Sequence, residues 1–179
     1  INPSIQPCDP QQKLQQLLNH VRHHSPYYQK LYQHVPAHSV NLQDYPVLCL
    51  EDFWSANSID DNQVLTAKNA NGITFKSGGS TGKPKYSVYS NEDWDAFTYA
   101  FGQGMKRAGL QDGEQIGNLF YAGRLYASFL FITKSIEQAG VGMCYPIGGI
   151  EPEEIIEVWK QFNLTTLVGI PTTLINMLS

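Results

Sequence analysis

The chain has little of what several protein classes require. Its 179 residues include three cysteines, Cys8, Cys49 and Cys144. This odd, widely spaced set argues against a disulfide-built fold and suits a reducing compartment. No apolar run approaches the roughly 20 residues that a bilayer-spanning helix needs. The formal net charge is -4, so no basic surface indicates a nucleic-acid partner. We therefore expect a cytoplasmic protein that binds neither membranes nor nucleic acid.

A metal-binding pattern is also lacking. His20, His23 and His24 have helical spacing, but no cysteine or carboxylate lies close enough in that helix to complete a ligand set. A solvated helix end is the favoured interpretation, and we expect no metal site.

What the chain does have is a segment rich in glycine, hydroxyl groups and lysine between two predicted strands. It reads Ser77-Gly78-Gly79-Ser80-Thr81-Gly82-Lys83-Pro84-Lys85. Glycines let the main chain turn sharply, and successive N–H groups in such a turn form an anion-binding concavity. Hydroxyl and ammonium groups add donors to phosphate oxygens. The segment predicts a polyphosphate-binding loop, with a glycine-rich hairpin that binds nothing as the alternative.

The loop does not fit the nucleotide-binding motif of P-loop NTPases. That motif reads G-x-x-x-x-G-K-S/T and opens a helix. Here Ser77 stands five residues before Gly82, and Pro84 follows Lys83. The next residues, 86–90, are β-branched or aromatic and predict a strand.

Alternating elements predict an α/β fold. Strands are expected at residues 73–76, 86–90, 115–121, 141–146 and 165–170. Helices are expected both before and after the loop. Before the loop, Ser25 should cap a helix whose first residue is Pro26. The later helices should start near Asn91, which can act as the cap, near Arg124 and near Glu151 and Thr172. N-terminal helices followed by βαβ units imply a mainly parallel sheet.

The loop resembles the phosphate loop of the adenylate-forming enzymes, which include the acyl- and aryl-CoA ligases. Their loop reads roughly S/T-S/T-G-S/T-T-G-x-P-K, and Gly78 stands where they usually have a hydroxyl. Within that superfamily the chain is most similar to the phenylacetate–CoA ligase branch. Four weaker matches follow its order: residues 14–28, 45–53, 109–114 and 168–174. The resemblance covers nearly the whole chain.

The resemblance implies a reaction and its reactants. A carboxylic acid, expected to be aromatic, joins the α-phosphate of ATP with Mg2+, pyrophosphate leaves, and CoA is the usual acceptor. The phosphate-binding residues would be Ser77, Gly78, Gly79, Ser80, Thr81, Gly82, Lys83 and Lys85. Thr81 and Lys85 would be catalytic, because donors around the leaving pyrophosphate stabilise its developing charge.

Three segments that follow predicted strands supply substrate-site candidates, since ligands bind at strand carboxyl ends in α/β sheets. Tyr121 and Gly123 lie in a stretch that resembles the border of the branch's aryl pocket. Gly148, Gly169 and Pro171 follow the next two strands. The alternatives are that Tyr121 is a core aromatic and that the glycines merely form turns.

The resemblance also sets expectations about the whole protein. Adenylate-forming enzymes are more than twice this long, so we expect the N-terminal part of a larger enzyme that is inactive alone. A homodimer is one option for the full-length enzyme. Residues 1–72 would form an arm and helical segment and residues 73–179 a truncated α/β core, both within one domain. The alternatives are an acyl-protein synthetase and a non-catalytic module that binds nucleotide phosphates.

Overall fold

The computed structural model describes residues 9–68, 71–77 and 84–177. Two compact units divide the chain, Ile1–Ala70 and Asn71–Ser179. Among the described residues, no helix has the length and apolarity to cross a membrane.

The first unit is helical. It contains α1 (Pro10–His24), α2 (Pro26–Leu31), the 3-10 helix η1 (Leu42–Asp44) and α3 (Leu50–Ala56). Ser25 is fully buried and accepts a hydrogen bond from the Tyr28 amide, so the predicted cap at Ser25 and Pro26 is confirmed. The Arg22 guanidinium lies over the Tyr45 ring and donates to the carbonyls of Val35 and Pro36. These contacts hold α1 against the segment that follows α2.

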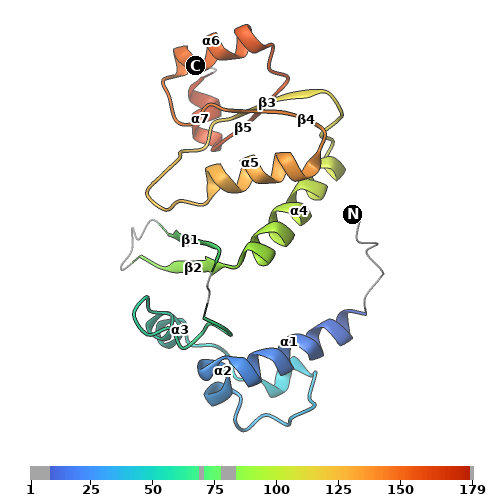
Figure 1. Cartoon of the computed structure of the whole chain (residues 1–179), viewed down its shortest axis with the longest axis vertical. Helices are drawn as coiled ribbons and strands as arrows, with labels where there is room; N and C mark the ends of the chain where they lie inside the picture. Colours follow the sequence, from blue (N-terminus) through green and yellow to red (C-terminus); the bar gives the residue numbers. More distant parts are fainter. Residues whose placement is uncertain (1–8, 69–70, 78–83, 178–179) are drawn as a thin grey trace. The chain divides into compact units, whose positions relative to one another are not determined.

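The second unit contains a three-stranded parallel sheet and a separate two-stranded one, and it confirms the predicted α/β class. Strands β3 (Glu114–Asn118), β4 (Gly142–Pro146) and β5 (Thr166–Val168) are parallel, in the order β4-β3-β5. Helix α5 (Ser128–Ala139) lies on one face, and α6 (Pro152–Phe162) and α7 (Pro171–Asn176) lie on the other (Figure 1). Ile116, Ile132 and Ile136 form the core between β3 and α5.

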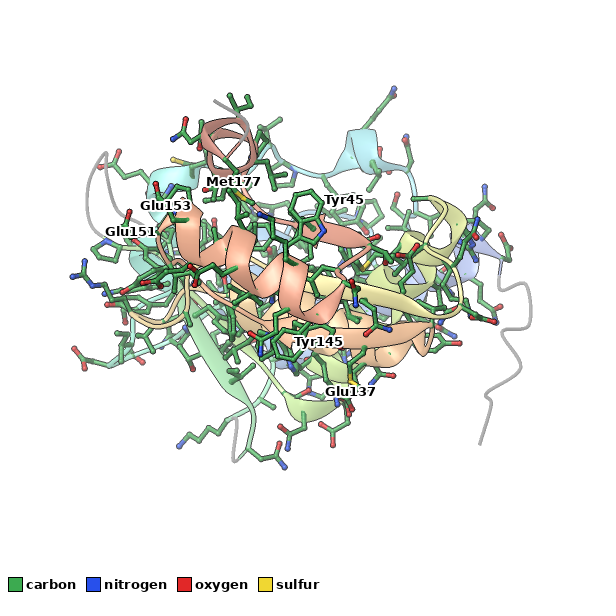
Figure 2. The ribbon with its side chains drawn as sticks, turned by 90° about the horizontal axis from the view of Figure 1, so that it is seen from above. Tyr45, Glu137, Tyr145, Glu151, Glu153 and Met177 are labelled. Carbon is green, nitrogen blue, oxygen red and sulfur yellow. The ribbon has the colours of Figure 1, made fainter. Side chains whose placement is uncertain are left out.

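A side chain of β4 joins the sheet to α6. Figure 2 shows Tyr145 beside α6, and the Tyr145 and Phe162 ring centroids are 5.1 Å apart. The Tyr145 hydroxyl donates a 2.6 Å hydrogen bond to Oε1 of Gln115 on β3. Tyr145 therefore spans from the central strand to the end of α6.

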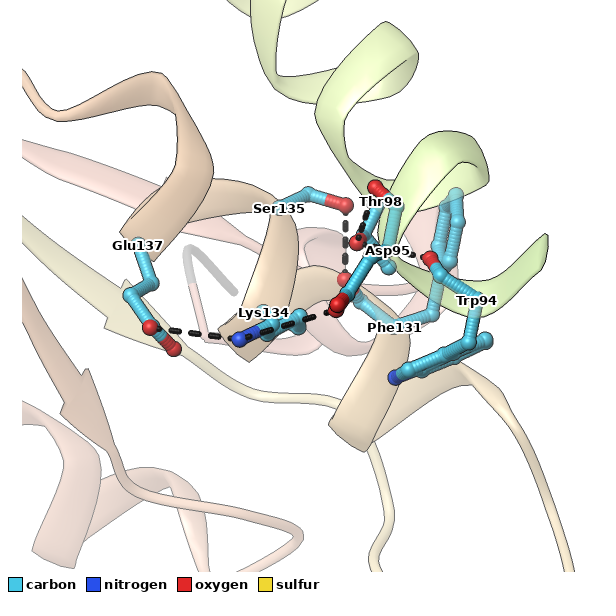
Figure 3. Close-up of polar contacts among 7 residues, drawn as sticks. All are labelled: Trp94, Asp95, Thr98, Phe131, Lys134, Ser135 and Glu137. Carbon is cyan, nitrogen blue, oxygen red and sulfur yellow. Dashed lines mark hydrogen bonds and ion pairs between the residues drawn. The ribbon is translucent and has the colours of Figure 1, made fainter. Parts of the chain in front are cut away.

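Helices α4 (Asn91–Arg107) and α5 cross closely because small residues meet there. Gly102 and Ser135 are buried, and a Cβ on Gly102 would lie 2.4 Å from the Ser135 carbonyl oxygen. Thr98 and Ser135 donate their hydroxyl protons to carbonyls one turn earlier in their own helices, Trp94 and Phe131 (Figure 3). The buried hydroxyls are thereby satisfied without separating the helices.

Several predicted boundaries are wrong, among them the end of β5, which lies at Val168 instead of residue 170. Ser90, rather than Asn91, caps α4, and its hydroxyl accepts from the Asp93 amide at 3.0 Å. Strand β3 ends at Asn118 instead of residue 121, because the Asn118 side chain accepts from the Phe120 amide and turns the chain. Helix α5 begins at Ser128 instead of Arg124, since Arg124 is left-handed with φ 51.

Candidate functional site

The ends of the predicted phosphate loop lie together. Strands β1 (Ile73–Lys76) and β2 (Tyr86–Tyr89) form an antiparallel hairpin. Beyond it, the Ser77 amide donates to the Lys85 carbonyl at 2.8 Å, and the Lys85 amide donates to Ser77 Oγ at 3.1 Å. Both residues are exposed. The other predicted phosphate contacts, Gly78, Gly79, Ser80, Thr81, Gly82 and Lys83, lie outside the described residues.

Aromatic packing fixes the hairpin that carries this loop. Buried Phe75 on β1 packs against Trp94 of α4, with ring centroids 5.0 Å apart. Tyr89 on β2 stacks on Phe97 of α4, with centroids 5.8 Å apart and planes 4° from parallel. Phe97 in turn contacts Phe131 of α5. Both strands of the hairpin are thus held against helices of the same unit.

The predicted substrate segments meet at one edge of the sheet. The Asn118 carbonyl accepts from the amides of Ile147 and Gly148, at 3.1 and 2.9 Å, and the Leu119 amide donates to the Val168 carbonyl. The segments that follow β3, β4 and β5 therefore lie side by side where they leave the carboxyl ends of the strands. A Cβ on Gly149 would lie 3.7 Å from a ring carbon of Tyr121. The structure thus brings Tyr121 and Gly148 to the same edge.

Gly169 and Pro171 follow β5 at this edge and have structural roles there. A Cβ on Gly169 would lie 3.2 Å from the Cβ of Leu119, so the close approach of these two segments favours glycine. Pro171 is the first residue of α7, where a missing amide proton costs nothing. Neither role requires a ligand.

Tyr121 is not a core aromatic. Its side chain is 49% exposed, Tyr126 is 36% exposed, and their ring centroids lie 6.3 Å apart, edge to face. At the carboxyl end of the sheet, the exposed face of the Tyr121 ring offers an apolar surface against which a ligand could pack.

A left-handed turn after Tyr121 is hydrogen-bonded to the hairpin of β1 and β2, which carries the predicted phosphate loop. Gly123, Arg124 and Leu125 have φ values of 103, 51 and 63. The Leu125 carbonyl accepts a 3.0 Å hydrogen bond from the amide of Lys76, the last residue of β1. No described atom would lie within 4 Å of a Cβ on Gly123. Left-handed conformations in two successive non-glycine residues are uncommon and cluster at functional sites.

Sequence reasoning missed Asn118, a fully buried polar residue at the end of the central strand. Its side-chain amide donates to the Phe129 carbonyl and to Thr133 Oγ1, each at 3.0 Å, and accepts from the Phe120 amide at 3.1 Å. The only sequence signal was an asparagine within the apolar run from Ile116 to Phe120.

Two titratable groups of the sheet have shifted pKa values. Hydrogen bonds from the hydroxyls of Thr165 and Thr166 lower the pKa of Glu114, at the opposite edge of the sheet. Burial raises the pKa of the half-buried Cys144 thiol, so it is a poor nucleophile. Among the described residues, no three histidine, cysteine or acidic side chains are grouped as metal ligands.

Comparison with known proteins identifies the fold. No family model and no curated protein matches the chain. Solved structures of a 2-hydroxyisobutyryl-CoA ligase are similar to it. The open conformation, in complex with 2-HIB-AMP and CoA, has a TM-score of 0.81 at 15% identity. The chain has the fold of part of an adenylate-forming enzyme domain.

The similarity extends over most of the chain in more than one state of that ligase. The thioesterification state, with 2-HIB-AMP and CoA, has a TM-score of 0.80 at 18% identity, and the postadenylation state, with 2-HIB-AMP, has 0.79 at 16%. Each match covers 93% of the chain. The chain spans only 37% or 38% of the length of the ligase structures.

Proposed function

We propose that the chain is the N-terminal part of an ATP-dependent carboxylic acid–CoA ligase. The observation that carries this proposal is the Lys76–Leu125 hydrogen bond. It ties the hairpin of a loop with an adenylate-forming signature to the segment that follows the central strand. A triphosphate held by the loop and an acid held at the sheet edge would then meet in the same unit.

The proposed reaction needs no side-chain nucleophile. A carboxylate oxygen attacks the α-phosphorus of MgATP, the bond to the β-phosphate oxygen breaks, and pyrophosphate leaves with the bonding electrons. The CoA thiolate then attacks the acyl carbon, and AMP leaves. The loop contributes donors to the leaving pyrophosphate, with Thr81 and Lys85 in catalytic roles. Such a donor is worth about 3 to 4 kcal/mol.

An aromatic acid is the proposed substrate class. The exposed Tyr121 ring offers a stacking surface, and the space beside Gly123 would admit a flat ring. Aromatic pairs gain about 0.5–1.5 kcal/mol beyond burial alone. The structurally similar ligase bears a branched hydroxy acid in its name, so 2-hydroxyisobutyrate is the natural competitor in any test.

The experiment is an acid panel run on the full-length protein. Pyrophosphate release is measured with MgATP and phenylacetate, benzoate, 2-hydroxyisobutyrate or octanoate, with and without CoA. We expect acid-dependent release, aryl acids ahead of the alkyl acids, and an acyl-CoA product. No acid-dependent release with any acid would contradict the ligase assignment. An acyl adduct that survives denaturation would point to an acyl-protein synthetase instead.

The 179-residue chain alone provides a second test. We expect no acid-dependent pyrophosphate from it, since the ligase structures that it matches are more than twice as long. Phosphate contacts alone would give weak nucleotide binding, at about millimolar Kd, or 4 kcal/mol. Adenylation by the purified chain would contradict this expectation.

A further inference from the structure

The Asn118 side chain ties together both ends of the segment that carries Tyr121 and Gly123. At the start of this segment, Oδ1 of Asn118 accepts from the Phe120 amide at 3.1 Å. At its end, in the first turn of α5, Nδ2 donates to the Phe129 carbonyl at 3.0 Å. One planar amide thus sets the separation and the relative orientation of the two ends of the segment.

A further contact makes this amide group rigid. Nδ2 donates its second proton to Thr133 Oγ1 at 3.0 Å, and the Thr133 hydroxyl donates to the carbonyl of Phe129 at 2.8 Å. Asn118 is fully buried, and both amide protons and the amide oxygen have partners. A buried polar network that is fully satisfied specifies a single geometry, whereas an apolar side chain at this place would fill the space without fixing it.

The main chain of Asn118 extends the same control to the neighbouring strand. Its carbonyl accepts from the amides of Ile147 and Gly148, in the turn that leaves β4. Because these bonds use main-chain atoms, substitution of the side chain leaves them in place. The effect of a side-chain variant is therefore directed to the segment between β3 and α5.

We propose that Asn118 is the positioning residue of the candidate acid site, which it sets by fixing the 119–127 segment relative to the phosphate-loop hairpin. This inference rests on the proposed function. Asn118 does not touch the reacting atoms. It acts through the segment, whose middle is bound to the hairpin by the Lys76–Leu125 hydrogen bond. Misplacement of a substrate by about 1 Å can cost on the order of 100-fold in rate.

The first experiment measures kinetics on the full-length protein with phenylacetate and 2-hydroxyisobutyrate as probe acids. Asn118→Leu and Thr133→Val are compared with Thr133→Ser, which keeps the hydroxyl. We expect kcat for pyrophosphate release to fall at least about 10-fold in the first two and to recover in Thr133→Ser, with KM for ATP within about twofold of wild type.

Matched controls separate positioning from stability. Ser135→Ala removes a buried hydroxyl from the same helix, where it bonds to the Phe131 carbonyl. Ile116→Ala destabilises the same strand through the core. Both should lower the melting temperature and leave kcat within about twofold. Wild-type kcat in Asn118→Leu and Thr133→Val, at melting temperatures lowered as in the controls, would overturn the inference. Absence of acid-dependent turnover in the wild type would instead overturn the proposed function.

The second experiment does not depend on activity. Hydrogen–deuterium exchange of the Asn118→Leu and Thr133→Val proteins should rise at least about tenfold in peptides that cover residues 119–127, with exchange in α6 unchanged. Exchange of residues 119–127 at the wild-type rate in both variants would overturn the inference whatever the kinetics.

Discussion

The Lys76 amide donates a 3.0 Å hydrogen bond to the Leu125 carbonyl. Lys76 ends the strand before the predicted phosphate loop, and Leu125 lies in the left-handed turn after the central strand. The two sequence segments that were singled out for different substrates are therefore bonded to each other.

The first prediction concerns the phosphate loop. In the full-length protein, Thr81→Ala with Lys85→Ala should reduce kcat/KM for ATP at least about 100-fold, because both substitutions would remove proposed donors to the leaving pyrophosphate. The melting temperature should change little. Lys106→Ala, which removes a surface charge at the end of α4, is the control and should keep wild-type kinetics. Normal pyrophosphate release by the double variant would contradict the assignment.

The second prediction concerns the acid site and uses two matched glycines. Gly123 and Gly113 both have positive φ, 103 and 91, and no described atom lies within 4 Å of a Cβ built on either. Gly113 directly precedes β3, and Gly123 lies five residues after its last residue, Asn118. Gly123→Leu should raise KM for the acid much more than KM for ATP, whereas Gly113→Leu should strain the turn equally and leave both values unchanged. Equal effects of the two variants on KM for the acid would contradict the assignment of Gly123 to the acid site.

Tyr121 gives a third prediction about selectivity. Tyr121→Ala should reduce the preference for phenylacetate over 2-hydroxyisobutyrate by up to about tenfold, because the aryl ring loses its stacking partner. The measurement is kcat/KM for each acid, alongside the melting temperature. Unchanged selectivity with a lowered melting temperature would make Tyr121 a structural residue.

The crossing of α4 and α5 gives a fourth prediction, on stability. Gly102→Ala should lower the free energy of unfolding by about 1–3 kcal/mol, since the new Cβ would lie 2.4 Å from the main-chain oxygen of Ser135. Gly104→Ala, in the same helix with open space around it, should stabilise by up to about 1 kcal/mol. Denaturant midpoints measure both. A stabilising Gly102→Ala would show that the helices can separate freely.

The fifth prediction follows from the lowered pKa of Glu114. A carboxyl group whose pKa is lower in the folded state stabilises the fold above its unfolded pKa, and this contribution is lost as the pH falls through the folded value. Glu114→Gln should therefore melt below wild type at neutral pH, and the gap should close as the pH falls below about 4. Thr166→Val removes one hydrogen-bond donor to Glu114. In a protein that carries Thr166→Val, the loss of melting temperature caused by Glu114→Gln at neutral pH should therefore be smaller. A difference in melting temperature between wild type and Glu114→Gln that stays constant from neutral pH to below pH about 4 would contradict this prediction.

Much of the fold could be predicted from the sequence because its signals are local. Alternating apolar segments predicted the parallel strands, and Ser25 with Pro26 predicted the start of α2. The start of α5 could not be predicted, since Arg124 and Leu125 adopt left-handed conformations that their residue types disfavour. A hydrogen bond to distant Lys76 accompanies that turn, and no local pattern encodes it.

The site was predicted unevenly for a related reason. The loop motif and the strand ends are read directly from residue order, so Ser77, Lys85 and Tyr121 could be proposed as candidates. Asn118 could not, because its partners Phe129 and Thr133 come from the following helix. A single asparagine among apolar residues indicates that a polar group is buried there, but it does not show which groups that side chain binds.

The outer strands of the sheet have a consequence for handling the chain. Among the described residues, β4 and β5 each have one neighbour, and neither strand contains a charged side chain. Outer strands without charges are templates for pairing with further copies. Mutual repulsion opposes such pairing, and it is weakest near the sequence pI of about 5.7. Light scattering against pH should therefore show maximal self-association of the purified chain close to that value, falling on either side as colloidal repulsion returns.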